Sequence, residues 1–372
     1  MINIAFMVTT LRSSGPVNIL YGLVKYLDKT KYNPYIITLK EELGSSRFND
    51  FVKIGVNTTL IKCNNIQCIL GRNKKLDIFL QENNIDIIHT HCAMSSIMVT
   101  NFQNSKIKII TTIHCDFKTY FNITFKFYNW YFYYILYKRS LLKMDKVISC
   151  GKSLTKLNYE NAHIVSTSVV NGIDTEMFIK SFNTSKYALR KKLNLLNEKK
   201  YFIVTSTNNG KNTEFLVNFF KSRKNTNDIL IILGNGDIRE EILKNEYPNI
   251  ICPGKVTLNE VGYYLRASDY FISASRSEGM PNAVLEALYY ELPVLLSDID
   301  PHREILNIAP SDYIGEIFKN DSFEILEEKV SKLKNYNFSS RNFLIIKKYI
   351  DAKRMAKEYE NEYIKLLKKG KK

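Results

Sequence analysis

The residues best suited to chemistry lie in the stretch Ser277-Glu-Gly-Met-Pro-Asn-Ala-Val-Leu-Glu286, which follows a predicted strand and opens a predicted helix. Free backbone N–H groups at a helix start bind anions such as a pyrophosphate. Eight positions separate Glu278 from Glu286, at most ~12 Å at helical rise. One carboxylate could therefore hold a sugar and the other a ribose, with phosphates between them. The alternative is an ordinary capped helix with surface carboxylates.

The elements that must position this stretch follow a regular alternation of short β-branched runs and amphipathic segments. Such a rhythm is typical of βαβ units in a parallel sheet with helices on both faces. The first series of predicted strands is Ile2–Val8, Tyr35–Leu39, Ile85–His89, Ile107–Ile113 and Lys146–Ser149. The second series is Tyr201–Thr205, Ile229–Leu233, Ile250–Cys252, Tyr270–Ser273 and Val294–Ser297.

The two series predict an α/β protein with two doubly wound, Rossmann-like domains facing a cleft. Val170-Asn-Gly-Ile-Asp174 and the polar stretch Asn183–Lys200 separate the series. We expect an N-terminal domain over residues 1–169 and a C-terminal domain over residues 170–350. Residues 351–369 predict an amphipathic helix, with Met355, Tyr359 and Tyr363 spaced to share one buried face.

Composition narrows the class of protein. The 372 residues carry a formal charge of +16, which favours acidic partners such as phosphorylated molecules, nucleic acid or anionic lipid. No nucleic-acid-binding motif accompanies the charge, so we expect no nucleic-acid partner. The six cysteines lack paired spacing, which indicates free thiols in a reducing compartment. The N-terminus reads as a strand, and no apolar stretch is long enough to span a membrane.

The Glu278…Glu286 pattern, continued by Pro293-Val-Leu-Leu-Ser-Asp-Ile-Asp-Pro-His-Arg-Glu304, resembles the retaining, nucleotide-sugar-dependent glycosyltransferases of the GT4 type. The bacterial capsule, exopolysaccharide and O-antigen members are the most similar in character. The resemblance covers nearly the whole chain. Further matching motifs, each weak alone, follow in the expected order: Gly15-Pro-Val-Asn, Val170 to Phe178, Lys211-Asn, Leu233-Gly-Asn-Gly-Asp237 and Pro253-Gly-Lys-Val256.

This resemblance implies a GT-B fold and a transfer that retains the anomeric configuration without a metal or other cofactor. It implies that Glu278 contacts the donor sugar, that Glu286 binds the ribose, and that Lys211 neutralises the departing diphosphate, where a fixed cation lowers the barrier. The implied catalytic residues are Glu278, His114 and Lys211. The implied donor-binding residues are Gly15, Ser206, Lys211, Val256, Glu278, Gly279, Met280, Asn282 and Glu286.

One position departs from the family pattern. The family usually has an arginine five residues before Lys211, whereas this chain has Ser206, which carries no charge. Lys211 then acts alone, or Arg276 or Arg303 supplies the second cation. The departure also supports an alternative in which the chain is a non-catalytic GT-B partner protein. A sugar-nucleotide epimerase is a further alternative.

His114 ends a predicted strand, and in the family a histidine at such a strand end faces the donor sugar. The alternative is a packed strand-end histidine. His89, His91 and Cys92 lie near His114 and Cys115 in the predicted sheet, but no second closely spaced ligand pair completes a metal site. We therefore expect no metal.

The segment Tyr120–Lys143 combines eleven aromatic residues with basic ones. As a helix it could lie on a bilayer surface with its cations at anionic headgroups, or it could be an aromatic core helix with a solvated basic face. Together these features predict a hexosyltransferase of surface-polysaccharide synthesis, using a nucleotide sugar, with UDP favoured over GDP. The expected acceptor is a saccharide, lipid-linked in the leading interpretation. The expected location is the cytoplasm, with a peripheral contact to the membrane.

Overall fold

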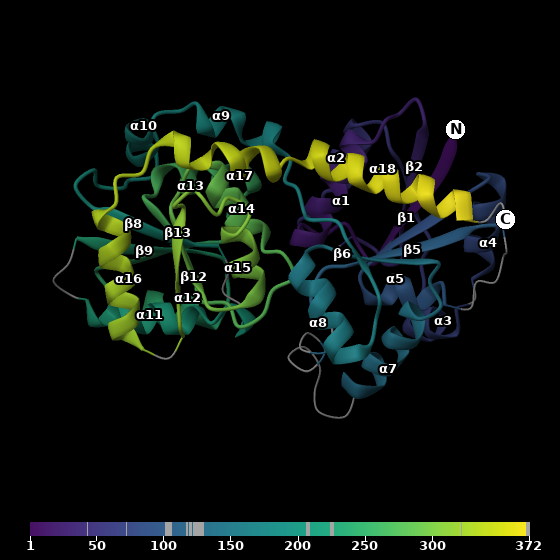
Figure 1. The fold of residues 1–372 in the computed structure, drawn as a ribbon, viewed down its shortest axis with the longest axis horizontal. Coiled ribbons are helices and arrows are strands. Elements are labelled where there is room, and N and C mark those ends of the chain that lie inside the picture. The colour runs from purple at the N-terminus through teal and green to yellow at the C-terminus, as the bar shows by residue number, and fades with distance from the viewer. Residues whose placement is uncertain are drawn as a thin grey trace. The chain divides into compact units, whose positions relative to one another are not determined.

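A computed structural model describes residues 1–42, 44–71, 73–100, 106–116, 118, 121, 130–205, 209–223, 227–320 and 322–369. The chain divides into two compact units (Figure 1). The first contains residues 1–172 and 352–372, and the second contains residues 173–351. The division falls at Gly172 and Ile173, within the Val170–Asp174 segment that separates the two predicted strand series.

The first unit is built on a parallel sheet whose strands are buried on both faces near the centre, as helices on both sides require. In sheet order the strands are β3 (Asn57–Leu60), β2 (Tyr32–Thr38), β1 (Ile2–Val8), β4 (Ile87–His91), β5 (Lys108–Ile113), β6 (Lys146–Ser149) and β7 (Thr167–Ser168). The helices are α1 (Gly15–Tyr26), α2 (Phe48–Lys53), α3 (Asn65–Leu70), α4 (Lys74–Glu82), α5 (Ala93–Met98), α7 (Trp130–Leu141), α8 (Lys152–Ala162) and α18 (Ala352–Lys369).

The final helix, α18, belongs to the first unit although it follows the whole of the second in sequence. It packs against α1, where Gly22 allows close approach, because a Cβ there would lie 3.1 Å from the Cβ of Ala352. Met355, Tyr359 and Tyr363 are all 0% exposed, so the predicted buried face is confirmed. Figure 1 shows the helix in yellow beside α1.

The second unit repeats the plan with a second parallel sheet. Its strands in sheet order are β10 (Ile250–Gly254), β9 (Asp228–Leu233), β8 (Lys200–Val204), β11 (Tyr270–Ser273), β12 (Val294–Ser297) and β13 (Gly315–Phe318). The α-helices are α9 (Ile179–Phe182), α10 (Lys186–Lys192), α11 (Thr213–Ser222), α12 (Asp237–Asn245), α13 (Leu258–Ala267), α14 (Asn282–Tyr289), α15 (Asp300–Leu306), α16 (Phe323–Asn335) and α17 (Leu344–Tyr349). Short 3₁₀ turns are η1 (Thr175–Phe178), η2 (Asn209–Lys211) and η3 (Ser340–Phe343).

Both sheets change direction at their centre. The chain builds outward from β1 through β2 to β3, then returns to the other side of β1 with β4. The second sheet does the same from β8, with β9 and β10 on one side and β11 on the other. In open α/β sheets, ligands bind at the carboxyl ends of the strands where this reversal occurs. The topology therefore gives each unit one preferred place for a site.

The predicted strands are all present, with boundaries shifted by a few residues. The pattern missed β3, β7 and β13. β3 has the polar sequence NTTL and lies at an exposed sheet edge, and β7 is two residues long, so neither carries a hydrophobic run. The polar stretch Asn183–Lys200, read as part of a domain boundary, instead contains α10 and lies inside the second unit.

Candidate functional site

The reversal point of the second sheet lies between β8 and β11, which are hydrogen-bonded neighbours. Lys211 ends the 3₁₀ turn η2 on the connection that leaves β8. Glu278 lies in the loop between β11 and α14. Parallel strands place their carboxyl ends at the same sheet edge, so the topology alone brings these two connections together.

The two side chains form an ion pair between Nζ of Lys211 and Oε1 of Glu278. Ser275 donates a second hydrogen bond to the same carboxylate oxygen, at 2.7 Å. Glu278 is 10% exposed and Lys211 is 28% exposed, so the ammonium is the more accessible partner. The carboxylate is thus held by two donors, while the cation remains open to an anionic ligand.

A buried polar layer supports the loop that carries Glu278. Ser273 and Ser275 bring their hydroxyls within 3.0 Å, and Ser297 donates to the backbone carbonyl of Ser275 at 2.6 Å. Nδ1 of His302 lies 2.9 Å from the carbonyl of Ser297. His302 is fully buried, and burial is the main reason that its pKa is lowered. The hydrogen bond to Ser297 and the nearby carboxylate of Glu278 oppose this shift only in part. The sequence motif included His302 but gave it no role.

Of the two candidate second cations, Arg276 lies beside Lys211. It donates to Oδ1 of Asn212, the residue after Lys211, at 2.9 Å. Arg303 instead pairs with Asp298 through two contacts of 2.5 and 2.8 Å. Ser206, at the position of the usual family arginine, lies outside the described residues.

The helix that carries the second glutamate, α14, begins at Asn282. Pro281 is the N-cap of α14 rather than its first helical residue. Gly279 and Met280 are buried in the preceding loop, and Asn282 and Glu286 are half-buried on α14. The structure therefore places these donor-site candidates in one loop–helix segment that follows β11.

The loops after β9 and β10 are tied together and contain Val256. The N–H of Gly234 donates to the carbonyl of Gly254 at 2.9 Å, and Oδ1 of Asn235 accepts from the N–H of Lys255 at 2.8 Å. Gly254 has φ +91°, a backbone conformation that L side chains rarely adopt, so a substitution there would be strained. Val256 is half-buried just beyond this junction.

In the first unit, Gly15 begins α1 on the connection that leaves β1, the central strand of that sheet. Ser14 is its N-cap and adopts an extended conformation. Gly15 is half-buried. It therefore lies at the reversal point between β1 and β4, where its backbone could approach a ligand.

His114 follows β5, and its Nε2 lies 2.9 Å from Nδ1 of His91, the last residue of β4. Their rings stack with centroids 5.2 Å apart. His89 lies beside His91, with ring centroids 4.4 Å apart. Its nitrogens contact Tyr363 of α18 and Thr112 of β5, each at 2.8 Å. The sequence predicted a role for His114 alone, whereas the structure gathers it into this histidine cluster, His89, His91 and His114.

Burial makes the histidine cluster electrically neutral near pH 7. It lowers the pKa of His89 to about 3, that of His114 to about 4, and that of His91 well below its usual value. In the part of the chain that the structure describes, no group of three or more His, Cys, Asp or Glu side chains is arranged to hold a metal ion.

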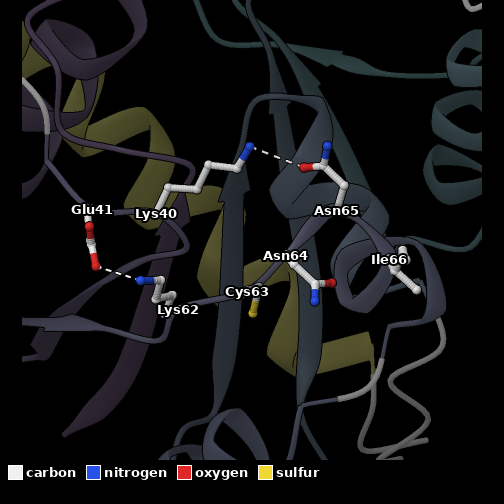
Figure 2. Close-up of a pocket in the computed structure, with 7 residues that line it drawn as sticks. All are labelled: Lys40, Glu41, Lys62, Cys63, Asn64, Asn65 and Ile66. Carbon is white, nitrogen blue, oxygen red and sulfur yellow. Dashed lines mark hydrogen bonds and ion pairs between the residues drawn. The ribbon is translucent and has the colours of Figure 1, made fainter.

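A pocket of about 600 Å³, which the sequence did not suggest, lies at the carboxyl ends of β2 and β3 and is lined mainly by charged and polar residues (Figure 2). Nζ of Lys40 donates to Asn65 at 3.1 Å, and Lys62 pairs with Glu41 at 2.7 Å. The Lys62–Glu41 pair is exposed, and such surface pairs contribute ~0–1 kcal/mol. The pocket is two strands away from β4 in the sheet, so it is separate from the histidine cluster.

Part of the aromatic–basic segment falls on α7. Of residues 120–129, the structure describes Phe121, and the others lie outside the described residues. Tyr134 and Tyr137 of α7 are buried, so part of its aromatic content is core. Tyr131, Phe132 and Ile135 are 58%, 52% and 43% exposed. The buried face of α7 therefore belongs to the core, and the membrane contact stays a prediction. No helix within the described ranges is long and apolar enough to cross a bilayer.

Comparisons with known proteins identify the class. Residues 13–177 match the family described as Glycosyltransferase Family 4, and residues 198–336 match the family described as Glycosyl transferases group 1. Each match lies on one of the two Rossmann-like sheets. The protein is a glycosyltransferase. The chain belongs to the GT4-type enzymes with a GT-B fold, and the resemblance inferred from the motifs is confirmed.

Individual relatives are similar over long stretches at modest identity. The UDP-Gal:alpha-D-GlcNAc-diphosphoundecaprenol alpha-1,3-galactosyltransferase of Escherichia coli is 24% identical over 75% of this chain and 76% of its own length. An O-antigen biosynthesis glycosyltransferase of Escherichia coli is 24% identical over 97% of each chain. A glycosyltransferase of Rickettsia africae, known as a crystal structure, has a TM-score of 0.76 at 18% identity over 99% of each chain.

Proposed function

We propose that this enzyme transfers a hexosyl group from a nucleotide sugar to a saccharide acceptor with retention of anomeric configuration. The observation that carries the proposal is the Lys211–Glu278 pair at the reversal point of the second sheet. A cation and a carboxylate held side by side match a ligand that joins a diphosphate to a polyhydroxylated sugar.

Each member of the pair has a separate task in the proposed reaction. Lys211 contacts the diphosphate and stabilises the charge that develops as the bond between C1 and the phosphate oxygen breaks. Glu278 accepts hydrogen bonds from donor-sugar hydroxyls. Its carboxylate is already held by Lys211 and Ser275, which suits orientation of the sugar better than attack on C1. The acceptor oxygen bonds to C1 on the face that the phosphate leaves, and its proton passes to that phosphate.

Further residues complete the proposed donor site. Glu286 binds the ribose hydroxyls, and the N–H groups near Gly279 and Met280 contact the phosphates or the sugar. Arg276, beside Lys211, replaces the cation that Ser206 cannot provide. His114 contacts a sugar hydroxyl. No metal ion is required for this scheme, because the charge of the diphosphate is met by side-chain cations and backbone N–H groups.

We further propose a UDP-sugar donor and a lipid-linked acceptor in surface-polysaccharide synthesis. The support is the long match to an enzyme whose name specifies UDP-galactose and a diphosphoundecaprenol-linked sugar, together with the O-antigen relative. The net charge of +16 fits substrates that carry phosphates.

The test is binding and transfer with a panel of UDP-, GDP- and dTDP-sugars in EDTA. We expect selective binding of a UDP-sugar and transfer to a diphosphate-linked saccharide with the anomeric configuration retained. Glu278→Gln should lower turnover ~10²-fold or more, the loss typical of one transition-state contact. Glu214→Gln, at an exposed position on α11, is the matched control and should leave turnover unchanged. Equal turnover of the two variants would remove Glu278 from the site.

The exposed face of α7 supports a proposed peripheral contact with an anionic membrane. Tyr131, Phe132 and Ile135 are exposed apolar side chains, and Arg139 on the same helix is an exposed cation. Aromatic residues with nearby cations are the groups that bind the headgroup region of a bilayer. Such binding would bring a lipid-linked acceptor to the enzyme.

Flotation with phosphatidylglycerol-containing liposomes at low salt tests this contact. The triple variant Tyr131→Ser, Phe132→Ser and Ile135→Ser should lose most of the binding. Leu344→Ser with Ile345→Ser removes exposed apolar side chains from α17 of the second unit and should bind like wild type. Equal loss in both variants, or no binding by wild type, would exclude α7 as the membrane contact.

A further inference from the structure

The pairing of His91 with His114 constrains which ring nitrogens carry protons. Nδ1 of His91 and Nε2 of His114 lie 2.9 Å apart. A neutral imidazole has one N–H donor and one acceptor nitrogen. Burial lowers the pKa of both histidines, so both rings are neutral and only one of them donates in this contact. Two arrangements of the protons are therefore open.

The other nitrogen of His91 distinguishes these arrangements. Nε2 of His91 is buried and has no hydrogen-bond partner among the described residues. If His114 donated, the proton of His91 would sit on Nε2, and a buried N–H would lack an acceptor. Orphaned buried N–H groups are rarer in proteins than acceptors that lack a donor. The favoured arrangement places the proton of His91 on Nδ1, where it donates to His114.

His91 is also held firmly enough to impose this arrangement. It is 0% exposed, and its ring lies between those of His89 and His114, at 4.4 and 5.2 Å. The ring of Phe6 from β1 lies 6.3 Å away. The next residue, Cys92, adopts φ +76° at the start of α5, a conformation that costs a non-glycine residue ~1–3 kcal/mol. Backbone strain of this kind gathers at functional sites.

We propose that His91 is a positioning residue that fixes His114 as the tautomer with its proton on Nδ1. Nε2 of His114 accepts from His91, so Nδ1–H is the group that His114 presents to a ligand. His114 then acts as a hydrogen-bond donor to a sugar oxygen and not as a base. The last step rests on the proposed role of His114 in sugar transfer, whereas the tautomer itself does not.

Long-range ¹H–¹⁵N NMR of the full-length wild-type protein tests the tautomer directly, without a substrate. The signal of His114 is identified by its loss in His114→Gln. We expect Nδ1 of His114 to resonate as a protonated nitrogen and Nε2 as an unprotonated one. The opposite pattern, or an equal mixture of tautomers, would overturn the proposal.

Two substitutions of His91 then test its control over His114. In His91→Asn the side-chain amide can donate from the position of Nδ1, and the tautomer should stay. In His91→Asp the carboxylate only accepts, and the proton of His114 should move to Nε2. A merely space-filling role would leave the tautomer unchanged in both variants, and that result would contradict the proposal.

Turnover supplies the second measurement. His91→Leu should lower kcat ~10-fold, as expected from the loss of about one hydrogen bond's free energy, with little change in KM. His91→Asn should restore most of this loss. Unchanged kcat in His91→Leu would overturn the positioning role. If the proposed function itself were wrong, the result would be different. The wild-type enzyme would show no sugar transfer, while its NMR spectrum would still show the proton of His114 on Nδ1.

Discussion

The two units share one topology but place different chemistry at the carboxyl ends of their central strands. In the first unit the polar groups are His89, His91 and His114, which are neutral because burial lowers their pKa. In the second unit the corresponding region contains an ion pair, Lys211 with Glu278. The fold therefore supplies the location of a site, and the local side chains decide its charge.

The difference follows from what surrounds each group. The histidine cluster is closed on one side by α18, through Tyr363 on His89 and Tyr359 on Thr112. A closed, buried site cannot hold an unpaired charge at modest cost, so imidazoles there stay neutral. Lys211 is 28% exposed, and its charge is both paired and partly solvated. The charged unit suits a diphosphate, and the neutral unit suits hydroxyl groups.

The largest expected effect comes from opening the closed site. Tyr363→Ala removes a fully buried ring and should cost about 3–5 kcal/mol of the stability of the first unit. Tyr363→Phe, which removes only the hydroxyl bonded to His89, should cost about 1 kcal/mol. Urea unfolding followed by hydrogen exchange in β4 measures both. Similar costs for the two variants would show that the ring itself contributes little.

The next effect concerns the charged site. Lys211→Met removes the cation and should lower kcat ~10²–10³-fold, the loss expected when a group that stabilises developing charge is deleted. Lys221→Met, at a lysine on α11 paired with Glu241, is the control and should retain turnover. Steady-state kinetics with the preferred nucleotide sugar gives the comparison. If Lys211→Met kept the wild-type kcat, the phosphate contact would be assigned to Arg276 instead of Lys211.

Acid should destabilise the two units to different extents. The pKa of His89 falls to about 3 and that of His114 to about 4 on folding, so below pH 6.5 the unfolded chain binds protons that the folded chain does not. Stability is therefore fully present above pH 6.5 and is lost as the pH falls toward 4. Each such histidine contributes a slope of about 1.4 kcal/mol per pH unit.

Hydrogen exchange at several pH values measures this difference in each unit. Peptides from β4 should lose protection at higher pH than peptides from β11. The first unit has the three histidines of the cluster, whose pKa values are lowered, whereas the second unit has one such buried histidine, His302. His91→Asn removes one of these histidines, so the stability of the first unit should depend less steeply on pH, by about 1.4 kcal/mol per pH unit. Equal slopes for the two units would contradict the contrast between a neutral and a charged site.

The smallest effect is a test of how Glu278 is held. Ser275→Ala removes the 2.7 Å hydrogen bond to the carboxylate while Lys211 remains. We expect about 1 kcal/mol less stabilisation of the reactive geometry, or about fivefold lower kcat/KM. Ser275→Thr, which retains the hydroxyl, should recover most of the activity. Kinetics of the two variants side by side decides whether Ser275 orients Glu278 or only packs beneath it.

Much of the fold was predictable because its signals are local. Strands such as Ile2–Val8 and Val294–Ser297 are almost entirely apolar. Such runs are typical of a parallel sheet that is covered by helices on both faces, because the side chains on both sides of the strand are then buried. The buried face of α18 follows from the spacing of Met355, Tyr359 and Tyr363. Edge strands such as β3 lack such a run, since an edge strand need not be buried, and they were missed.

The candidate site was only partly predictable. The ordered motifs single out Lys211, Glu278 and His114 as individual residues, and the family matches agree with the class of enzyme that those motifs indicate. The motifs assign no role to His302 or His91, because neither has a neighbour in sequence that signals its partner. His91 contacts His114 across two strands, and its orphaned Nε2 is visible only in three dimensions.

The sequence by itself determined the class of protein, the two strand series and the amphipathic face of the last helix, because these depend on residue type at short, regular spacing. The tertiary structure decided which groups meet. Lys211 and Glu278 are 67 positions apart, and His89 and Tyr363 are 274 apart. Periodicity carries no information about such distances. They are set when strand order and helix packing bring separate connections to the same sheet edge, where burial then decides which groups keep their charge.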